Sequence, residues 1–140
     1  MNVFEAFAIS GSALQAERTR VDVASLNLAN ANVTRTPDGR PYQPLRVVLG
    51  GAGAAFSGQF NRAMGVHVAS IEPTGAEPRR AHEPGHPDAD AQGFVSYPGV
   101  NNLTEMTTIM SAVRSYEANL AALGAAKSMA MKAIEIGGGS

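Results

Sequence analysis

The feature that most constrains the fold is a regular pattern in the C-terminal part of the chain. Mostly apolar residues follow alternating steps of three and four, and a further row recurs every seven residues. The first row is Leu103, Met106, Met110, Val113, Glu117, Leu120, Gly124, Lys127, Met131 and Ile134, and the further row is Ile109, Tyr116, Leu123 and Ala130. This spacing is typical of a coiled-coil helix. No proline interrupts it and Asn101 or Asn102 can cap its start, so we predict one helix from about 102 to 136, roughly 50 Å long.

The N-terminal part repeats this pattern more weakly. Its two rows are Phe4, Phe7, Gly11, Leu14, Arg18, Val21, Ser25 and Leu28, and Ile9, Ala13, Ala16 and Val23. The helix should end near residues 30–32, where short polar side chains compete for backbone hydrogen bonds. Terminal helices on either side of an insertion suggest that the chain ends meet. We therefore predict that residues 1–32 and 101–137 pair as a discontinuous, coiled-coil-like helical domain.

Residues 33–100 differ in composition from both ends, since they hold all 8 prolines and 10 of the 15 glycines. This part is predicted to be a β-rich insertion of turns and short strands. Strands are expected at 45–49, 66–71 and 94–97, a turn at 36–39, and a flexible connector at 50–55. The predicted fold class is mainly α with a small β-rich insertion.

Composition bears on how the helices are used. Only 6% of the residues are aromatic although 44% are hydrophobic, so few large side chains are present to fill an interior. The outward positions of both predicted helices are mostly small and uncharged, whereas a solvated helix usually has a charged face. Such helices look suited to being surrounded by neighbouring helices. An ordinary two-helix hairpin with an alanine-rich surface explains the same pattern equally well.

Charge and hydropathy disfavour several partners. A formal net charge of -1 favours neither nucleic acid nor an anionic membrane. No apolar run approaches the roughly 18–20 residues that span a bilayer, and the first residues lack the features of a cleavable signal peptide. The absence of cysteine excludes disulfides and thiolate metal ligands. We expect neither nucleic-acid binding nor membrane insertion.

One stretch suggests an enzyme, because residues 82–86 (His-Glu-Pro-Gly-His) have the letters of a zinc metalloprotease motif. That motif requires a helix, on which histidines four residues apart face the same metal ion. Pro84, Gly85 and Pro87 oppose a helix here. A soluble zinc hydrolase using His82, Glu83 and His86 is therefore kept only as an alternative. We predict a turn instead, with no catalytic residues, no metal and no cofactor.

Several segments resemble the axial proteins of the bacterial flagellum. Residues 25–32 (Ser-Leu-Asn-Leu-Ala-Asn-Ala-Asn) resemble a signature near the N-terminus of rod, hook and hook-associated proteins. Residues 37–42 and 84–95 are similar to the proximal rod proteins in particular, as are 105–106, 114–119 and 126–129. The signature turn contains Pro84, Gly85, His86, Pro87, Asp88, Asp90 and Gly93. One departure is Gly99, which stands where the family commonly has asparagine.

The resemblance implies a structural subunit of the basal-body rod, the drive shaft that transmits torque and surrounds the export channel. Rod proteins lie in the periplasmic part of the flagellum, which they reach through the flagellar type III export apparatus without a cleavable signal peptide. The implied partners are other rod proteins, further copies of the subunit, the adaptor between the rod base and the MS ring, and the export apparatus. A helical adaptor or chaperone is a further alternative.

Contacts between subunits are expected through the apolar stripes of both helices, which would be marginal in the free subunit. Buried amides that pair across helices would fix the register of these contacts. The candidates are Leu14, Val21, Asn27, Leu28, Asn30, Met106, Met110, Val113, Tyr116, Leu120 and Leu123. For the apolar residues a place in the core of a single subunit is at least as good an interpretation, and for the two asparagines a helix C-terminal cap.

Overall fold

The computed structural model describes residues 3–51 and 65–138 of the 140-residue chain. Its elements in chain order are α1 (Val3–Ala29), β1 (Leu45–Gly51), β2 (Val66–Pro73), β3 (Arg79–His82), β4 (Phe94–Tyr97) and α2 (Asn102–Gly137). The predicted class is confirmed, because two long helices enclose a part of the sequence that forms short strands.

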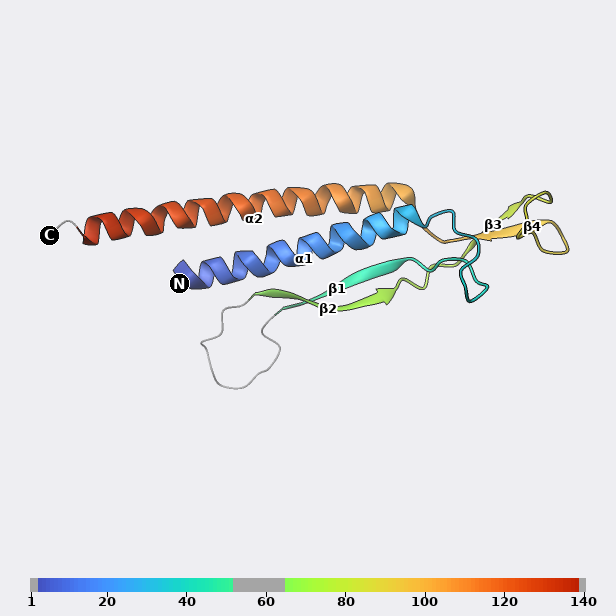
Figure 1. Cartoon of the computed structure of the whole chain (residues 1–140), viewed down its shortest axis with the longest axis horizontal. Coiled ribbons are helices and arrows are strands. Elements are labelled where there is room, and N and C mark those ends of the chain that lie inside the picture. Colours follow the sequence, from blue (N-terminus) through green and yellow to red (C-terminus); the bar gives the residue numbers. More distant parts are fainter. Residues whose placement is uncertain (1–2, 52–64, 139–140) are drawn as a thin grey trace.

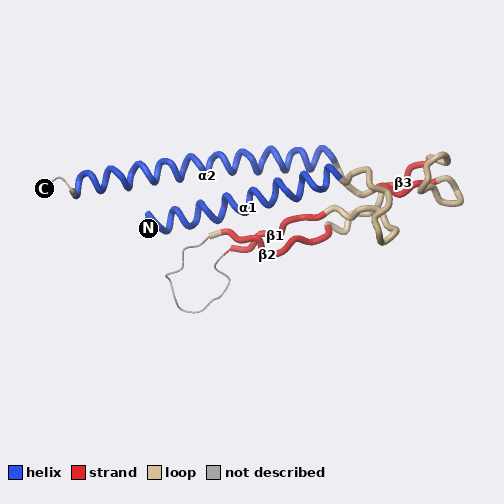
Figure 2. The backbone as a smooth tube through the Cα atoms, viewed as in Figure 1, coloured by secondary structure: helices blue, strands red, loops and turns tan. Residues whose placement is uncertain are grey.

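The helices lie side by side and run antiparallel (Figure 1). The hairpin of β1 and β2 packs on α1, so that α1 lies between this hairpin and α2. α2 continues past the start of α1. The second hairpin, β3 and β4, lies beyond the opposite ends of the helices (Figure 2). The molecule is therefore a rod with a small β tip at one end and an unpaired length of helix at the other.

Local polar groups set the helix ends. The Asn101 side chain accepts hydrogen bonds from the backbone N–H groups of Leu103 and Thr104 at 3.1 and 3.2 Å, which makes it the N-cap of α2. At the end of α1, the Asn30 side chain donates to the Leu26 carbonyl at 2.8 Å. Asn30 therefore acts as a C-terminal cap of α1, which is one of the two roles that the sequence suggested for it.

The seam between the helices is built from small side chains. Among the described elements α2 packs only on α1, and its buried residues are Ala112 and Ala126. Ala16 and Ala24 are the matching buried small residues of α1. Small residues allow close approach but bury little apolar area, so the helix pair gains modest hydrophobic stabilisation.

The end of the first predicted strand needs correction. Gly50 and Gly51 belong to β1, where they pair with His67 and Val66, and are not part of a flexible connector. A Cβ at Gly50 would lie 2.7 Å from Nε2 of His67, so the imidazole would have to move to admit any larger residue here. Residues 52–55 of the predicted connector lie outside the described residues. The remaining strands and the turn at 36–39 are confirmed.

β3 is absent from the predicted strands because its sequence, Arg-Arg-Ala-His, has no apolar alternation. It exists through its pairing with β4, where Arg79 lies opposite Tyr97 and His82 opposite Phe94. The Arg79 guanidinium lies 5.2 Å from the centroid of the Tyr97 ring. Stacking of cationic groups on aromatic rings thus replaces a hydrophobic face.

Two glycines should respond oppositely to alanine. A Cβ at Gly99 would lie 2.5 Å from the Glu77 carbonyl oxygen, so Gly99→Ala should destabilise the fold by about 1–3 kcal/mol. A Cβ at Gly124 meets nothing within 4 Å, so Gly124→Ala should stabilise α2 by about 0.5–1 kcal/mol. Urea unfolding of both variants tests this pair. Equal effects of the two substitutions would contradict the close approach at Gly99.

Candidate functional site

An exposed apolar stripe runs along α2. It consists of the apolar residues of the three-four row, Leu103, Met106, Met110, Val113, Leu120, Met131 and Ile134, all of which are exposed. Glu117, Gly124 and Lys127 of the same row are exposed as well. Leu120, near the middle of the helix, is 55% exposed. A stripe of this length on a water-facing helix is a surface suited to protein contact.

The stripe is distinct from the seam with α1. Successive residues of a helix are turned by about 100° from each other, so buried Ala112 and exposed Val113 face different directions. The three-four row therefore does not make the contact between α2 and α1. No Asp, Glu, Lys or Arg lies between Glu117 and Lys127 in the sequence, so little charge would oppose a neighbouring helix there.

The predicted contact residues fall into separate groups. Met106, Met110, Val113, Tyr116 and Leu120 are exposed on α2. The other apolar candidates are half-buried: Leu123 on α2, and Leu14, Val21 and Leu28 on α1. Part of each of these four side chains is covered within the subunit. Their use between subunits remains a prediction.

Asn27 has a role that neither interpretation anticipates. Asn27 is 1% exposed, near the end of α1. The amide nitrogen donates to the Leu45 carbonyl at 2.8 Å, and the amide oxygen accepts from the Leu45 N–H and the Tyr42 hydroxyl, both at 2.9 Å. The side-chain amide thus pairs with Leu45 as the backbone of a neighbouring strand would, and anchors the start of β1 to α1.

Ser12 makes a second contact of this kind, which sequence reasoning missed. Its hydroxyl oxygen accepts a hydrogen bond from the Val66 N–H at the start of β2, at 3.1 Å. Ser12 and Asn27 are separated by about 22 Å of helix, and Leu45 and Gly51 by about 20 Å of strand. Because Gly51 pairs with Val66, the two anchors match in spacing and fix the position of the hairpin along α1.

Tyr42 makes the Asn27 anchor sensitive to pH. Burial, followed by the negative charge of Glu105, raises the pKa of Tyr42 above its ordinary value of 10.0. Because the pKa of Tyr42 is raised in the folded state, the stabilisation that its hydroxyl contributes is complete below pH 10. This stabilisation is lost as the pH rises through the folded-state pKa.

Tyr42→Phe should therefore reduce the free energy of unfolding by about 1 kcal/mol at pH 7. The difference from the unsubstituted protein should shrink above about pH 10, because the phenol ionises more readily in the unfolded chain. Urea unfolding of both proteins from pH 7 to 11 measures the difference. A difference that stays constant across this range would show that the hydroxyl does not make the anchor pH-dependent.

The signature turn forms the tip of the β3–β4 hairpin. The N–H of Phe94 and that of Gln92 each donate to the Asp90 carboxylate at 2.9 Å, and Arg80 donates to its other oxygen. The hydrogen bond from Phe94 is the main cause of a lowered pKa of Asp90. Gly93 has a φ of 79°, which glycine adopts without strain. These residues act together to close the turn.

The zinc motif has no helical support in this structure. His82 lies in β3 against the Phe94 ring, with a centroid distance of 5.0 Å, and residues 84–88 form turns. Nδ1 of His86 accepts a hydrogen bond from the Asp88 N–H at 3.0 Å. Within residues 3–51 and 65–138, no three or more His, Cys, Asp or Glu side chains are grouped as a metal site would require.

Asp88 connects the turn to the segment that follows α1. Its carboxylate accepts a hydrogen bond from the Thr34 hydroxyl at 2.7 Å and lies 3.6 Å from the Arg35 guanidinium. Asp88→Ala should destabilise this connection by about 1 kcal/mol, mostly through the Thr34 bond, because the exposed arginine contributes little. Faster hydrogen exchange in residues 33–36 and 84–89 is expected. Asp38→Ala, at an exposed carboxylate, is the control, and unchanged exchange in Asp88→Ala would contradict the connection.

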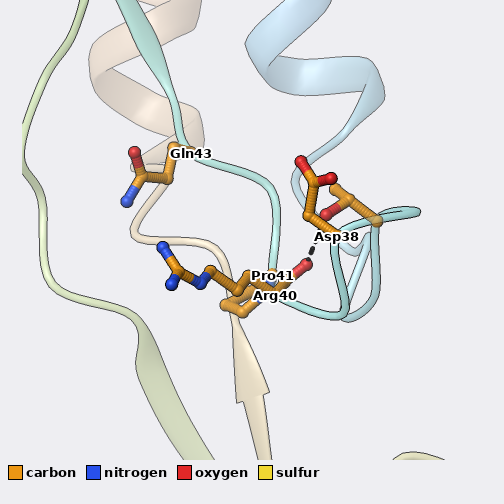
Figure 3. A pocket seen from close by; sticks show the side chains of 5 residues that line it. Asp38, Arg40, Pro41 and Gln43 are labelled. Atoms are coloured by element: carbon orange, nitrogen blue, oxygen red, sulfur yellow. Dashed lines mark hydrogen bonds between the residues drawn. The ribbon is translucent and has the colours of Figure 1, made fainter.

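A shallow pocket of about 480 Å³ lies at the loop before β1 (Figure 3). Its lining residues are Thr36, Asp38, Arg40, Pro41 and Gln43. Arg40 and Gln43 extend to one side of the loop and Asp38 lies on the other, so the charged groups do not converge on one point. The loop is closed by a hydrogen bond from the Thr36 hydroxyl to the Arg40 carbonyl at 2.9 Å. This arrangement contains no nucleophile paired with a base.

The described helices include none with both the length and the apolar character of a transmembrane span.

Comparison with known proteins gives matches at both ends of the chain. Residues 7–35 match the family described as "Flagella basal body rod protein", and residues 91–136 match "Flagellar basal body rod FlgEFG protein C-terminal". The chain is 43% identical to "Flagellar basal-body rod protein FlgC" of Salmonella typhimurium, in an alignment covering 98% of this chain and 99% of that protein. It is 40% identical to the protein of the same name from Bacillus subtilis, again over 98% and 99% of the two chains.

Proposed function

The chain belongs to the FlgC family of flagellar basal-body rod proteins and is a structural subunit of the rod, and we propose that it joins the rod through the exposed stripe on α2. The observation that carries this proposal is the apolar row that α2 turns away from α1. Full burial of one such Leu or Met side chain contributes about 1.5–3 kcal/mol. Several along one helix supply enough free energy for a stable contact between subunits.

The covering surface is a terminal helix of a neighbouring rod subunit. A contact in which one face of a subunit meets a different face of the next builds an open helical array, as a rod requires. The half-buried apolar residues of α1, Leu14, Val21 and Leu28, are the counterpart surface in this proposal. Torque then passes from subunit to subunit through packed helices, which also surround the export channel.

The unpaired end of α2 supports the same proposal. Met129, Met131, Ile134 and Ile136 are exposed and, at about 100° per residue, lie on several sides of the helix. Lys132 and Glu135 keep part of this surface charged, so Met131 and Ile134, which continue the stripe, are the residues that a neighbouring helix would cover. We expect a neighbouring subunit to cover this side of the helix end when the subunit assembles.

Location and partners follow partly from the family. Basal-body rod proteins assemble with other rod components in the basal body. The finer assignments are proposals: a periplasmic position, contacts with further copies and with the adaptor between rod base and MS ring, and delivery by the type III export apparatus without a cleaved signal. The small side chains of the helix seam favour such delivery, because a thinly packed core is easily unfolded.

Cysteine labelling tests the contact, since the chain has no cysteine of its own. Leu120→Cys places a thiol on the stripe, and Asp38→Cys places one in an exposed loop. In the free subunit both should react with a maleimide. In isolated basal bodies the thiol of Leu120→Cys should react at least tenfold less with the maleimide, whereas unassembled subunits remain labelled. Mass spectrometry of this chain measures the labelling. Equal reactivity at Leu120→Cys in the two states would exclude the stripe as a contact.

A further inference from the structure

The methionines of the described residues are placed unusually. All four lie on α2 and each is more than half exposed: Met106 at 57%, Met110 at 59%, Met129 at 64% and Met131 at 54%. Methionine is normally among the buried residue types. Exposed thioethers are accessible to small oxidants in water, whereas those packed in a core are shielded.

Three of the four methionines belong to the stripe. Met106 and Met110 are four residues apart and so occupy the same side of α2, and Met131 continues the same row. Met129 lies two residues from Met131, which turns it by about 160° to the other side of the helix. The chain therefore contains a natural control, a methionine as exposed as the others but away from the stripe.

Composition directs oxidation to these side chains. The chain has no cysteine and no tryptophan, so methionine sulfur is its softest target for two-electron oxidants. With hydrogen peroxide, the O–O bond breaks and one oxygen forms a bond to sulfur. The sulfur loses two electrons, and the other oxygen leaves as water. The product, methionine sulfoxide, is polar and carries a strong hydrogen-bond acceptor.

We propose that Met106, Met110 and Met131 form an oxidant-sensitive site that controls whether the free subunit can assemble. The inference rests on the proposed function, because it requires the stripe to be buried against a neighbouring subunit. A sulfoxide on the stripe would face an apolar surface without a hydrogen-bond donor, so the contact is weakened. The block is reversible, since thiol-dependent reductases remove the oxygen as water while two thiols form a disulfide. Assembled subunits are protected because the contact covers the sulfur atoms.

The experiment compares full-length proteins before and after hydrogen peroxide, with sulfoxides located by mass spectrometry. Association of the chain with itself and with purified rod proteins is followed by sedimentation velocity over a concentration series. Peroxide should weaken association of the unsubstituted protein at least about tenfold. Treatment with methionine sulfoxide reductase and dithiothreitol should restore it.

Two variants separate the site from general oxidative damage. The triple variant Met106→Leu, Met110→Leu, Met131→Leu keeps apolar side chains of similar volume, so it should associate normally and remain unaffected by peroxide. Met129→Leu should stay as sensitive as the unsubstituted protein. The proposal is overturned if the triple variant loses association on oxidation, or if a fully oxidised chain associates normally.

Leu120→Asp distinguishes failure of this inference from failure of the proposed function. If Leu120→Asp weakens association but sulfoxides on the stripe do not, the stripe is the contact and the oxidant-sensitive site is excluded. If Leu120→Asp associates normally, or if untreated protein shows no association, the proposed contact is wrong and the inference falls with it.

Discussion

Asn27→Ala should cost about 3 kcal/mol of the free energy of unfolding, the largest loss expected from a single truncation in this chain. The substitution removes all three hydrogen bonds of the anchor and leaves the N–H and carbonyl of Leu45, and the Tyr42 hydroxyl, without that partner. Packing cannot compensate, because the largest fully buried side chains among the described residues are Asn27 itself and Val95. Urea unfolding measures the loss, and hydrogen exchange at Leu45 reports where it occurs.

Asn30→Ala is the matched control for this prediction. It removes the same side-chain chemistry three residues away, but only a local bond to the Leu26 carbonyl, so a loss of at most about 1 kcal/mol is expected. If Asn27→Ala were as mild as Asn30→Ala, water would be replacing the amide and the anchor would not determine the position of the hairpin.

Leu120→Asp should abolish assembly of the rod while leaving the free subunit folded. A carboxylate buried without a partner at a contact between subunits costs several kcal/mol, so we expect association to be weakened at least about 100-fold. The monomer should be nearly unaffected, because Leu120 is 55% exposed within the subunit. Cells that carry this variant should be non-motile and should yield basal bodies without it.

Leu120→Met is the conservative partner of that experiment. It retains an apolar side chain of similar volume, so motility and incorporation should stay close to those of the unsubstituted chain. Thermal unfolding of the purified variants followed by circular dichroism separates assembly from folding. Normal motility with Leu120→Asp would show that neighbouring subunits leave this part of α2 uncovered.

The metalloprotease motif shows that the spacing of histidines in the sequence does not make a metal site when the backbone is not helical. His82 and His86 have the spacing of zinc ligands, but the prolines at 84 and 87 divide the stretch between a strand and two turns. Pattern and proline chemistry are both local, so the sequence was enough to predict the turn. The connection of Asp88 to Thr34 lay beyond it, because those residues are 54 positions apart.

Elements with local causes were predicted well, and elements that depend on a partner were not. Periodicity and the Asn101 cap define α2, and both can be read from neighbouring residues. β3 has no strand pattern of its own and exists because β4 pairs with it. Gly50 and Gly51 likewise became a strand through pairing with His67 and Val66, which lie across the hairpin.

The sequence by itself determined that the chain has two long helices, that α2 carries an apolar row, and that the chain resembles flagellar rod proteins. The tertiary structure decided which side of α2 packs on α1, and so left the Met106–Leu120 part of the row exposed. It also decided that Asn27 anchors a strand. Helical spacing arises from contacts a few residues apart, whereas the choice of partner depends on which distant surfaces fit, here small alanines on both helices and an amide matched to a strand backbone.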